Sequence, residues 1–120
     1  MKLNYMTLMV RDVQQSAEFY QNLAGLQEMN RLDLEQGSIR FLGNAKGETM
    51  LELIEFQDGE KVEAKGMVLS FLAEVDLEAL RKRALELGYH PSEIIAQGPK
   101  PRHFTVLDPD RLTVEFTSFS

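Results

Sequence analysis

The sequence repeats itself once, and this repeat constrains the fold more than any other feature. Phe41 is followed by Glu52 eleven positions later, and Phe104 is followed by Glu115 at the same spacing, so the two pairs lie 63 positions apart. Similarity at one fixed offset is typical of a duplicated supersecondary unit. A helix packed on one face of a small sheet leaves the other face exposed, so each copy needs a second element to bury that face. The sequence therefore predicts a fold built from two similar modules.

Each copy predicts the order strand, helix and three strands. In the first copy, apolar patterning and turn residues place these elements at 3–10, 12–25, 26–32, 38–42 and 49–56. In the second copy they fall at 67–72, 76–88, 92–96, 102–107 and 112–119. The helices are expected to begin at the N-caps Asp12 and Asp76 and to end at Gly25 and Gly88.

These elements predict an α+β fold of two tandem βαβββ modules within a single domain, 1–120. The first module covers about 1–57, a polar linker about 57–66, and the second module about 67–119.

Composition excludes several classes of function. The chain has no cysteine, so disulfides and thiolate metal sites are absent, which fits a cytoplasmic protein. Its 13 Lys and Arg against 19 Asp and Glu give a formal net charge of −6, which disfavours nucleic acid and anionic membranes as partners. The opening MKLNYMTLMVRD lacks the apolar region of a signal peptide, and no apolar run reaches the length of a membrane helix. We therefore expect a cytoplasmic protein.

Glu115 stands in a strand of apolar residues, where an acid is unexpected. A four-residue turn at 108–111 would place Phe104 opposite Glu115, with Arg102 on the same face, and would turn Phe116 toward the helix.

The same reasoning places Glu52 beside Phe41, on a face shared with Met50. One interpretation is that each glutamate lines a pocket, which its recurrence at equivalent places favours. The other is that each is solvated near a strand end or paired with Arg40 or Arg102.

Two segments resemble the hallmark segments of a known family, the vicinal oxygen chelate superfamily. They are VRDVQQSAEFYQNLAGL, at 10–26, and FTVLDPDRLTVEF, at 104–116, and the resemblance extends over nearly the whole chain. The family includes glyoxalase I, bleomycin-resistance proteins, fosfomycin-resistance enzymes and extradiol dioxygenases. The resemblance implies that the sheets of the two modules form a cleft or half-barrel with the helices outside.

The resemblance also implies where a metal would be held. Glyoxalase-like members bind a divalent ion through four positions, which here are Tyr5, Glu52, Met67 and Glu115. Histidine or glutamine is usual at the first and histidine at the third. A phenol and a thioether are poor ligands for such ions, so no cofactor is expected, although weak binding of a divalent ion by Glu52 and Glu115 is left open.

The two histidines add little to the candidate site. His90 follows the second helix, and His103 is expected to point away from Glu115 unless a bulge turns its strand. Neither pairs with a Ser or Cys nucleophile, and the glycines form no nucleotide-binding pattern.

The candidate site is therefore a mostly apolar face with two acids. The candidate catalytic residues are Glu52 and Glu115. The candidate ligand-binding residues are Tyr5, Met67, Phe71, Phe41, Phe104, Arg102 and Met50. Methionine and aromatic side chains suit irregular apolar ligands, but they equally suit a plain core or a dimer interface.

The leading hypothesis is a glyoxalase/bleomycin-resistance-like protein that binds a small molecule in a metal-free cleft. One alternative is a metal-dependent lyase or isomerase of the lactoylglutathione-lyase type. Another is a non-catalytic dimerisation or interaction module. Whether the protein is an enzyme is left open, and the resemblance implies a homodimer.

Overall fold

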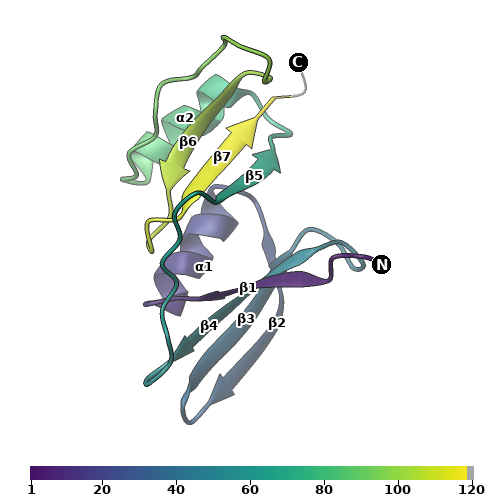
Figure 1. The fold of residues 1–120 in the computed structure, drawn as a ribbon, viewed down its shortest axis with the longest axis vertical. Coiled ribbons are helices and arrows are strands. Elements are labelled where there is room, and N and C mark those ends of the chain that lie inside the picture. Colours follow the sequence, from purple (N-terminus) through teal and green to yellow (C-terminus); the bar gives the residue numbers. More distant parts are fainter. Residues whose placement is uncertain (119–120) are drawn as a thin grey trace. The chain divides into compact units, whose positions relative to one another are not determined.

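A computed structural model describes residues 1–118, so the predicted strand end at Phe119 lies outside the described residues. The chain divides into two compact units, Met1–Glu63 and Ala64–Ser120, and each is described by itself (Figure 1). Within the described residues, neither helix is long and apolar enough to cross a membrane.

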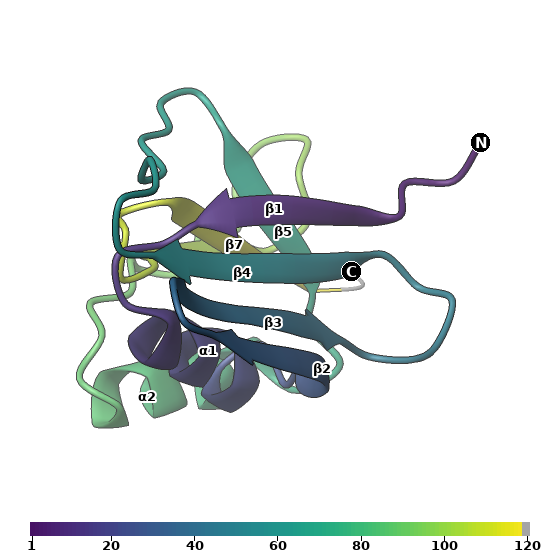
Figure 2. The same ribbon diagram turned by 90° about the horizontal axis from the view of Figure 1, so that it is seen from below.

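The first unit is a four-stranded sheet with one helix on one face. Its elements are β1 (Tyr5–Met9), α1 (Val13–Asn22), β2 (Gln27–Leu34), β3 (Gly37–Gly43) and β4 (Met50–Phe56). The strand order is β1-β4-β3-β2, with β1 parallel to β4 and the other pairs antiparallel (Figure 2). Phe19 and Tyr20 of α1 are fully buried, as are Leu42 and Leu53 on the sheet, so the core lies between helix and sheet.

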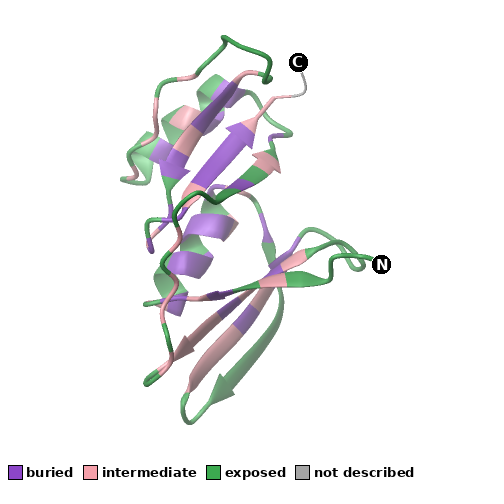
Figure 3. Ribbon diagram, viewed as in Figure 1, coloured by how far each residue is buried: buried purple, intermediate pink, exposed green. Residues whose placement is uncertain are grey.

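The second unit repeats this connectivity with one strand fewer. Its elements are β5 (Val68–Leu72), α2 (Leu77–Glu86), β6 (His103–Leu107) and β7 (Thr113–Thr117), and the sheet order is β5-β7-β6. Strand β5 runs parallel to β7 as β1 does to β4. Most residues of β6 and β7 are buried, whereas every residue of β2 in the first unit is exposed (Figure 3).

The predicted strand at 92–96 is wrong, because this segment makes only an isolated bridge between Ile95 and His103. Two backbone hydrogen bonds, of 2.8 and 3.1 Å, join these residues. Further along, the Ser92 hydroxyl accepts the N–H of Thr105 at 3.0 Å. The Ser92 side chain thus accepts the Thr105 N–H, which a backbone carbonyl would accept in a regular strand pair. No continuous ladder of backbone hydrogen bonds forms between this segment and β6.

Both helices begin where the sequence predicts. The Asp12 carboxylate accepts a hydrogen bond from the N–H of Gln15, and the Asp76 carboxylate accepts one from the N–H of Ala79, each at 3.1 Å. These bonds satisfy N–H groups that the first helical turn leaves free.

The connection between β6 and β7 is one residue longer than the predicted four-residue turn. Arg111 adopts a left-handed conformation, with φ of 68°. The Asp108 carboxylate accepts hydrogen bonds from the N–H groups of Asp110 and Leu112, both at 2.9 Å, and the backbone N–H of Asp108 donates to the carbonyl of Leu112. A turn that ends in a left-handed residue is a common hairpin connection.

The extra residue shifts the predicted pairing by one position. Thr105, rather than Phe104, pairs with Glu115, and Phe104 pairs with Phe116. Since a shift of one residue moves every side chain to the other face, the predicted faces of β6 are reversed.

Candidate functional site

The open face of the first sheet brings together residues from three strands. Tyr5 pairs with Met50, and Glu52 pairs with Thr7 on one side and with Phe41 on the other. Paired residues point to the same face of a sheet, so all five share the face opposite α1. The predicted placement of Glu52 beside Phe41 and Met50 is confirmed.

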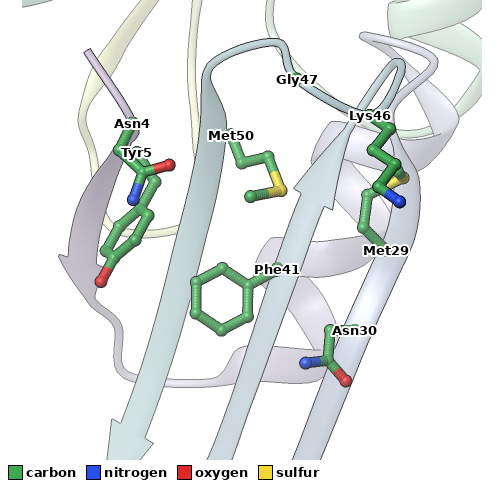
Figure 4. A pocket seen from close by; sticks show the side chains of 8 residues that line it. All are labelled: Asn4, Tyr5, Met29, Asn30, Phe41, Lys46, Gly47 and Met50. Carbon is green, nitrogen blue, oxygen red and sulfur yellow. The ribbon is translucent and has the colours of Figure 1, made fainter. Parts of the chain in front are cut away.

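A pocket of about 480 Å³ lies on this face. It is lined by Asn4, Tyr5, Met29, Asn30, Phe41, Lys46, Gly47 and Met50 (Figure 4). The rings of Tyr5 and Phe41 meet edge to face, with centroids 5.3 Å apart.

Gly43 gives the Met50 side chain its room. A Cβ atom at position 43 would lie 2.9 Å from the Cγ atom of Met50, which is closer than real contacts allow. The absence of a side chain at this position on β3 therefore lets Met50 lie over the strand. In Figure 4, Met50 and Phe41 occupy the middle of the pocket.

Polar groups stand at the two ends of the pocket. Figure 4 shows the Tyr5 hydroxyl and the Asn30 amide at one end and Lys46 and Gly47 at the other. The apolar middle and polar ends are typical of small-molecule sites.

Glu52 is half-buried, two residues beyond Met50 on β4. The Thr7 hydroxyl donates to its Oε1 atom at 2.5 Å. Within residues 1–118, no basic side chain forms an ion pair with Glu52. The carboxylate thus meets a neutral donor and no countercharge in this part of the chain.

Glu115 occupies the matching place in the second sheet and is buried. The Ser70 hydroxyl donates to its Oε1 atom at 2.7 Å, and the Lys100 ammonium donates to its Oε2 atom. Burial acts to raise the pKa of this carboxyl, but the bonds from Lys100 and Ser70, with the charges of Lys100 and His103, outweigh it and hold the pKa below its ordinary value.

The two hydroxyl groups that bond to the glutamates occupy equivalent places in the two units. The sequence alone did not identify them as site residues. Thr7 and Ser70 are 63 positions apart, which is the offset that relates Glu52 to Glu115. Each lies beside its glutamate in a parallel strand pair. Applying the offset to every short polar residue of the first strand would have found them. Lys100 comes from an irregular loop and has no such signal.

Phe104 and Phe71 were predicted on the same face as Glu115, and both placements are wrong. Phe104 is fully buried, with its ring centroid 5.4 Å from that of Phe116. Phe71 stacks on the other side of Phe116, at 5.8 Å. Phe104 thus belongs to the core and Phe71, which is half-buried, borders it, because both pair with Phe116 rather than with Glu115.

The shifted register also places the side chains of Arg102 and His103 on the faces opposite to those predicted. Arg102 forms an ion pair with Glu78 in the first turn of α2. It therefore neither pairs with Glu115 nor lies on the face of Glu115 as a candidate ligand-binding residue. His103 turns toward the face of Glu115, contrary to expectation, and is buried. Its Nδ1 atom lies 2.8 Å from the carbonyl oxygen of Pro101 and therefore donates.

Met67 precedes β5 and is exposed, so within its unit it lines no part of the site described above. Tyr5 pairs with the residue two before Glu52, and in the second sheet Val68 pairs with the residue two before Glu115. The counterpart of Tyr5 is thus Val68 rather than Met67. Neither valine nor methionine supplies a nitrogen or oxygen ligand.

The donors around each glutamate do not fit a divalent ion within either unit. Glu52 accepts a hydrogen bond from one hydroxyl, that of Thr7, and Glu115 already faces an ammonium group. No group of three His, Cys, Asp or Glu side chains in the described part of the chain could hold a metal. Such ions prefer several imidazole or carboxylate ligands.

Known structures share this fold. Glyoxalase I of Leishmania major, described as trypanothione-dependent, matches with a TM-score of 0.79 and 18% identity over 98% of this chain and 86% of that chain. TnmS3, an antibiotic-binding protein from Streptomyces sp. CB03234, matches with a TM-score of 0.77 and 19% identity over 100% and 97%. The fosfomycin resistance protein FosX of Mesorhizobium loti matches with a TM-score of 0.74 and 21% identity over 96% and 89%.

At these identities the structural likeness shows the fold alone, and no curated protein matches the sequence. A family model, however, matches residues 2–116, which is nearly the whole chain. The chain belongs to the Glyoxalase/Bleomycin resistance protein/Dioxygenase superfamily.

Proposed function

We propose that this protein binds a small molecule in the pocket on the open face of the first sheet. The observation that carries the proposal is the lining of this pocket, in which two aromatic rings and two methionines surround about 480 Å³ and polar groups stand at the ends. Aromatic rings supply rigid apolar contact, and methionine adapts to irregular ligands. TnmS3, which shares this fold, is an antibiotic-binding protein, in keeping with such a role.

We also propose that binding needs no metal ion. The support is chemical: the position where the family commonly has histidine or glutamine holds Tyr5, and the group bonded to Glu52 is the Thr7 hydroxyl. One carboxylate with two neutral oxygens is a poor set of ligands for zinc or nickel.

The experiment is a thermal-shift screen with aromatic, cationic and peptide-like compounds. A ligand present at 100 times its dissociation constant stabilises a protein by about 2.7 kcal/mol, which such a screen detects. Tyr5→Ala should weaken binding, since it removes one wall of the pocket. Leu32→Ala is the matched control, because Leu32 is an exposed residue on the same face that does not line the pocket. A flat screen, or equal affinity of Tyr5→Ala and wild type, would overturn the proposal.

A metal-dependent lyase or isomerase is the alternative, because both glutamate positions of the family are retained as Glu52 and Glu115. Its test is turnover of the hemithioacetal of methylglyoxal and glutathione with added nickel, zinc or manganese. Metal-stimulated turnover would favour the alternative, and a rate at background would exclude it.

We further propose a homodimer, as the family resemblance implies. Val68 and Leu72 support this, since β5 leaves both exposed on the face of Glu115. Light scattering after size-exclusion chromatography should give twice the monomer mass of 13.7 kDa. A monomeric mass at micromolar concentration would contradict it.

A further inference from the structure

We propose that the ligand of the first-sheet pocket is an amine, with a protonated ammonium group on Glu52 and an apolar, preferably aromatic, body among Tyr5, Phe41 and Met50. This inference rests on the proposed function and adds the chemical class of the ligand.

The second unit contains an internal example of the interaction. There the Lys100 ammonium donates to one oxygen of Glu115 while the Ser70 hydroxyl donates to the other. Ser70 and Glu115 are adjacent in a parallel strand pair, in the same relation as Thr7 and Glu52. A carboxylate with a hydroxyl on one oxygen thus receives a primary ammonium on the other in this very fold.

The first unit has the same pair without the cation. The Thr7 hydroxyl bonds to Oε1 of Glu52, and no ion pair to Glu52 exists within the described residues. The charge of Glu52 is therefore available to a ligand. The formal net charge of −6 adds a general attraction for cations.

The pocket lies where the body of such an amine would be. Phe41 pairs directly with Glu52, so the apolar floor of the pocket adjoins the carboxylate. The Tyr5 ring meets the Phe41 ring edge to face, and aromatic faces attract ammonium groups.

Charge also fixes the orientation of the ligand. Lys46 stands at the Met50 end of the pocket, close to the start of β4, whereas Glu52 lies further along that strand. An ammonium group at the Lys46 end would meet a like charge. The cation is therefore directed to the Glu52 end.

The test compares two fluorescent probes that differ in one group, 9-(aminomethyl)anthracene and 9-anthracenemethanol, in fluorescence titrations at neutral pH and low salt. The amine is protonated under these conditions and the alcohol is neutral. We expect the amine to bind at least about tenfold more tightly, as one charge-assisted hydrogen bond provides. Salt should reduce this preference, because Glu52 is partly exposed.

Variants locate the effect. Glu52→Gln should remove the preference for the amine, so that the two probes bind with similar affinity. Continued binding of the alcohol shows that the pocket is intact. Glu115→Gln is the matched control and should keep the preference.

Equal binding of both probes to wild type would overturn the inference and leave the pocket proposal standing. So would a preference that survives Glu52→Gln. If neither probe binds while only uncharged compounds of the screen do, the amine class is wrong. If no compound binds at all, the proposed function fails as well.

Discussion

Glu52 and Glu115 stand at equivalent places in two sheets of the same connectivity, yet their surroundings differ. Glu115 is buried between a hydroxyl and an ammonium group of its own unit. Glu52 is half-buried, bonded to one hydroxyl and next to an apolar pocket. The duplication kept the carboxylate and its hydroxyl neighbour in both units. In the second unit the chain itself supplies a cation, whereas in the first no ion pair to Glu52 is formed within the described residues.

The aromatic residues show the same division. Phe104 is fully buried against Phe116 in the second unit, whereas Phe41 is half-buried at the pocket of the first. The two phenylalanines are related by the repeat offset, but the register of β6 sends one into the core. Equivalent positions in the sequence thus serve core packing in one unit and line an open pocket in the other.

The largest difference is expected from truncating these two phenylalanines. Phe104→Ala should lower the free energy of unfolding by about 3–5 kcal/mol, because it leaves a cavity in a closed core. Phe41→Ala should cost about 1 kcal/mol and instead weaken ligand binding, since its ring borders an open pocket. Urea denaturation followed by circular dichroism measures both. Similar losses would mean that Phe41 also belongs to a core.

The glutamates should differ less, and the difference depends on pH. At pH 7, Glu115→Gln should cost about 1–3 kcal/mol, since it weakens two hydrogen bonds to a buried charge, while Glu52→Gln should stay within about 0.5 kcal/mol. Because the pKa of Glu115 in the folded state is below its ordinary value of 4.5, its stabilising effect is complete above that value and is lost as pH falls through the folded pKa.

The deficit of Glu115→Gln should therefore shrink between about pH 5 and pH 3. Denaturation curves of wild type and variant at several pH values measure it. A deficit that is constant over this range would show that the charge of Glu115 does not contribute.

The smallest effects are expected where the two units are alike. Asp12→Ala and Asp76→Ala each remove one N-cap hydrogen bond of 3.1 Å, and each should lower stability by about 1 kcal/mol. The same denaturation measurement applies. Clearly unequal losses would show that the two caps are not equivalent in energy, despite the equal lengths of their hydrogen bonds.

The repeat and the helix caps were predictable because they depend on local residue types at fixed spacing. The pairing of Phe41 with Glu52 followed from alternation along two strands and is confirmed. The faces of β6 were not predictable in this way, since they depend on the left-handed conformation of Arg111, a residue type that seldom adopts it. The contact of Lys100 with Glu115 joins a loop to a strand, and no periodic pattern reports such contacts.

The connection at 108–112 has a consequence for changes of chain length. The hydrogen bonds of the Asp108 carboxylate stabilise the conformation of this five-residue connection. The number of residues in the connection determines which side chains of β6 lie on the same face as Glu115. Removing one residue would shift the pairing of β6 by one position and move all its side chains to the opposite face. The imidazole of His103 would then enter the apolar core, and the phenyl ring of Phe104 would lie beside the carboxylate of Glu115. An insertion or deletion here is therefore equivalent to several simultaneous substitutions, and engineering of the second unit should leave this loop at its present length.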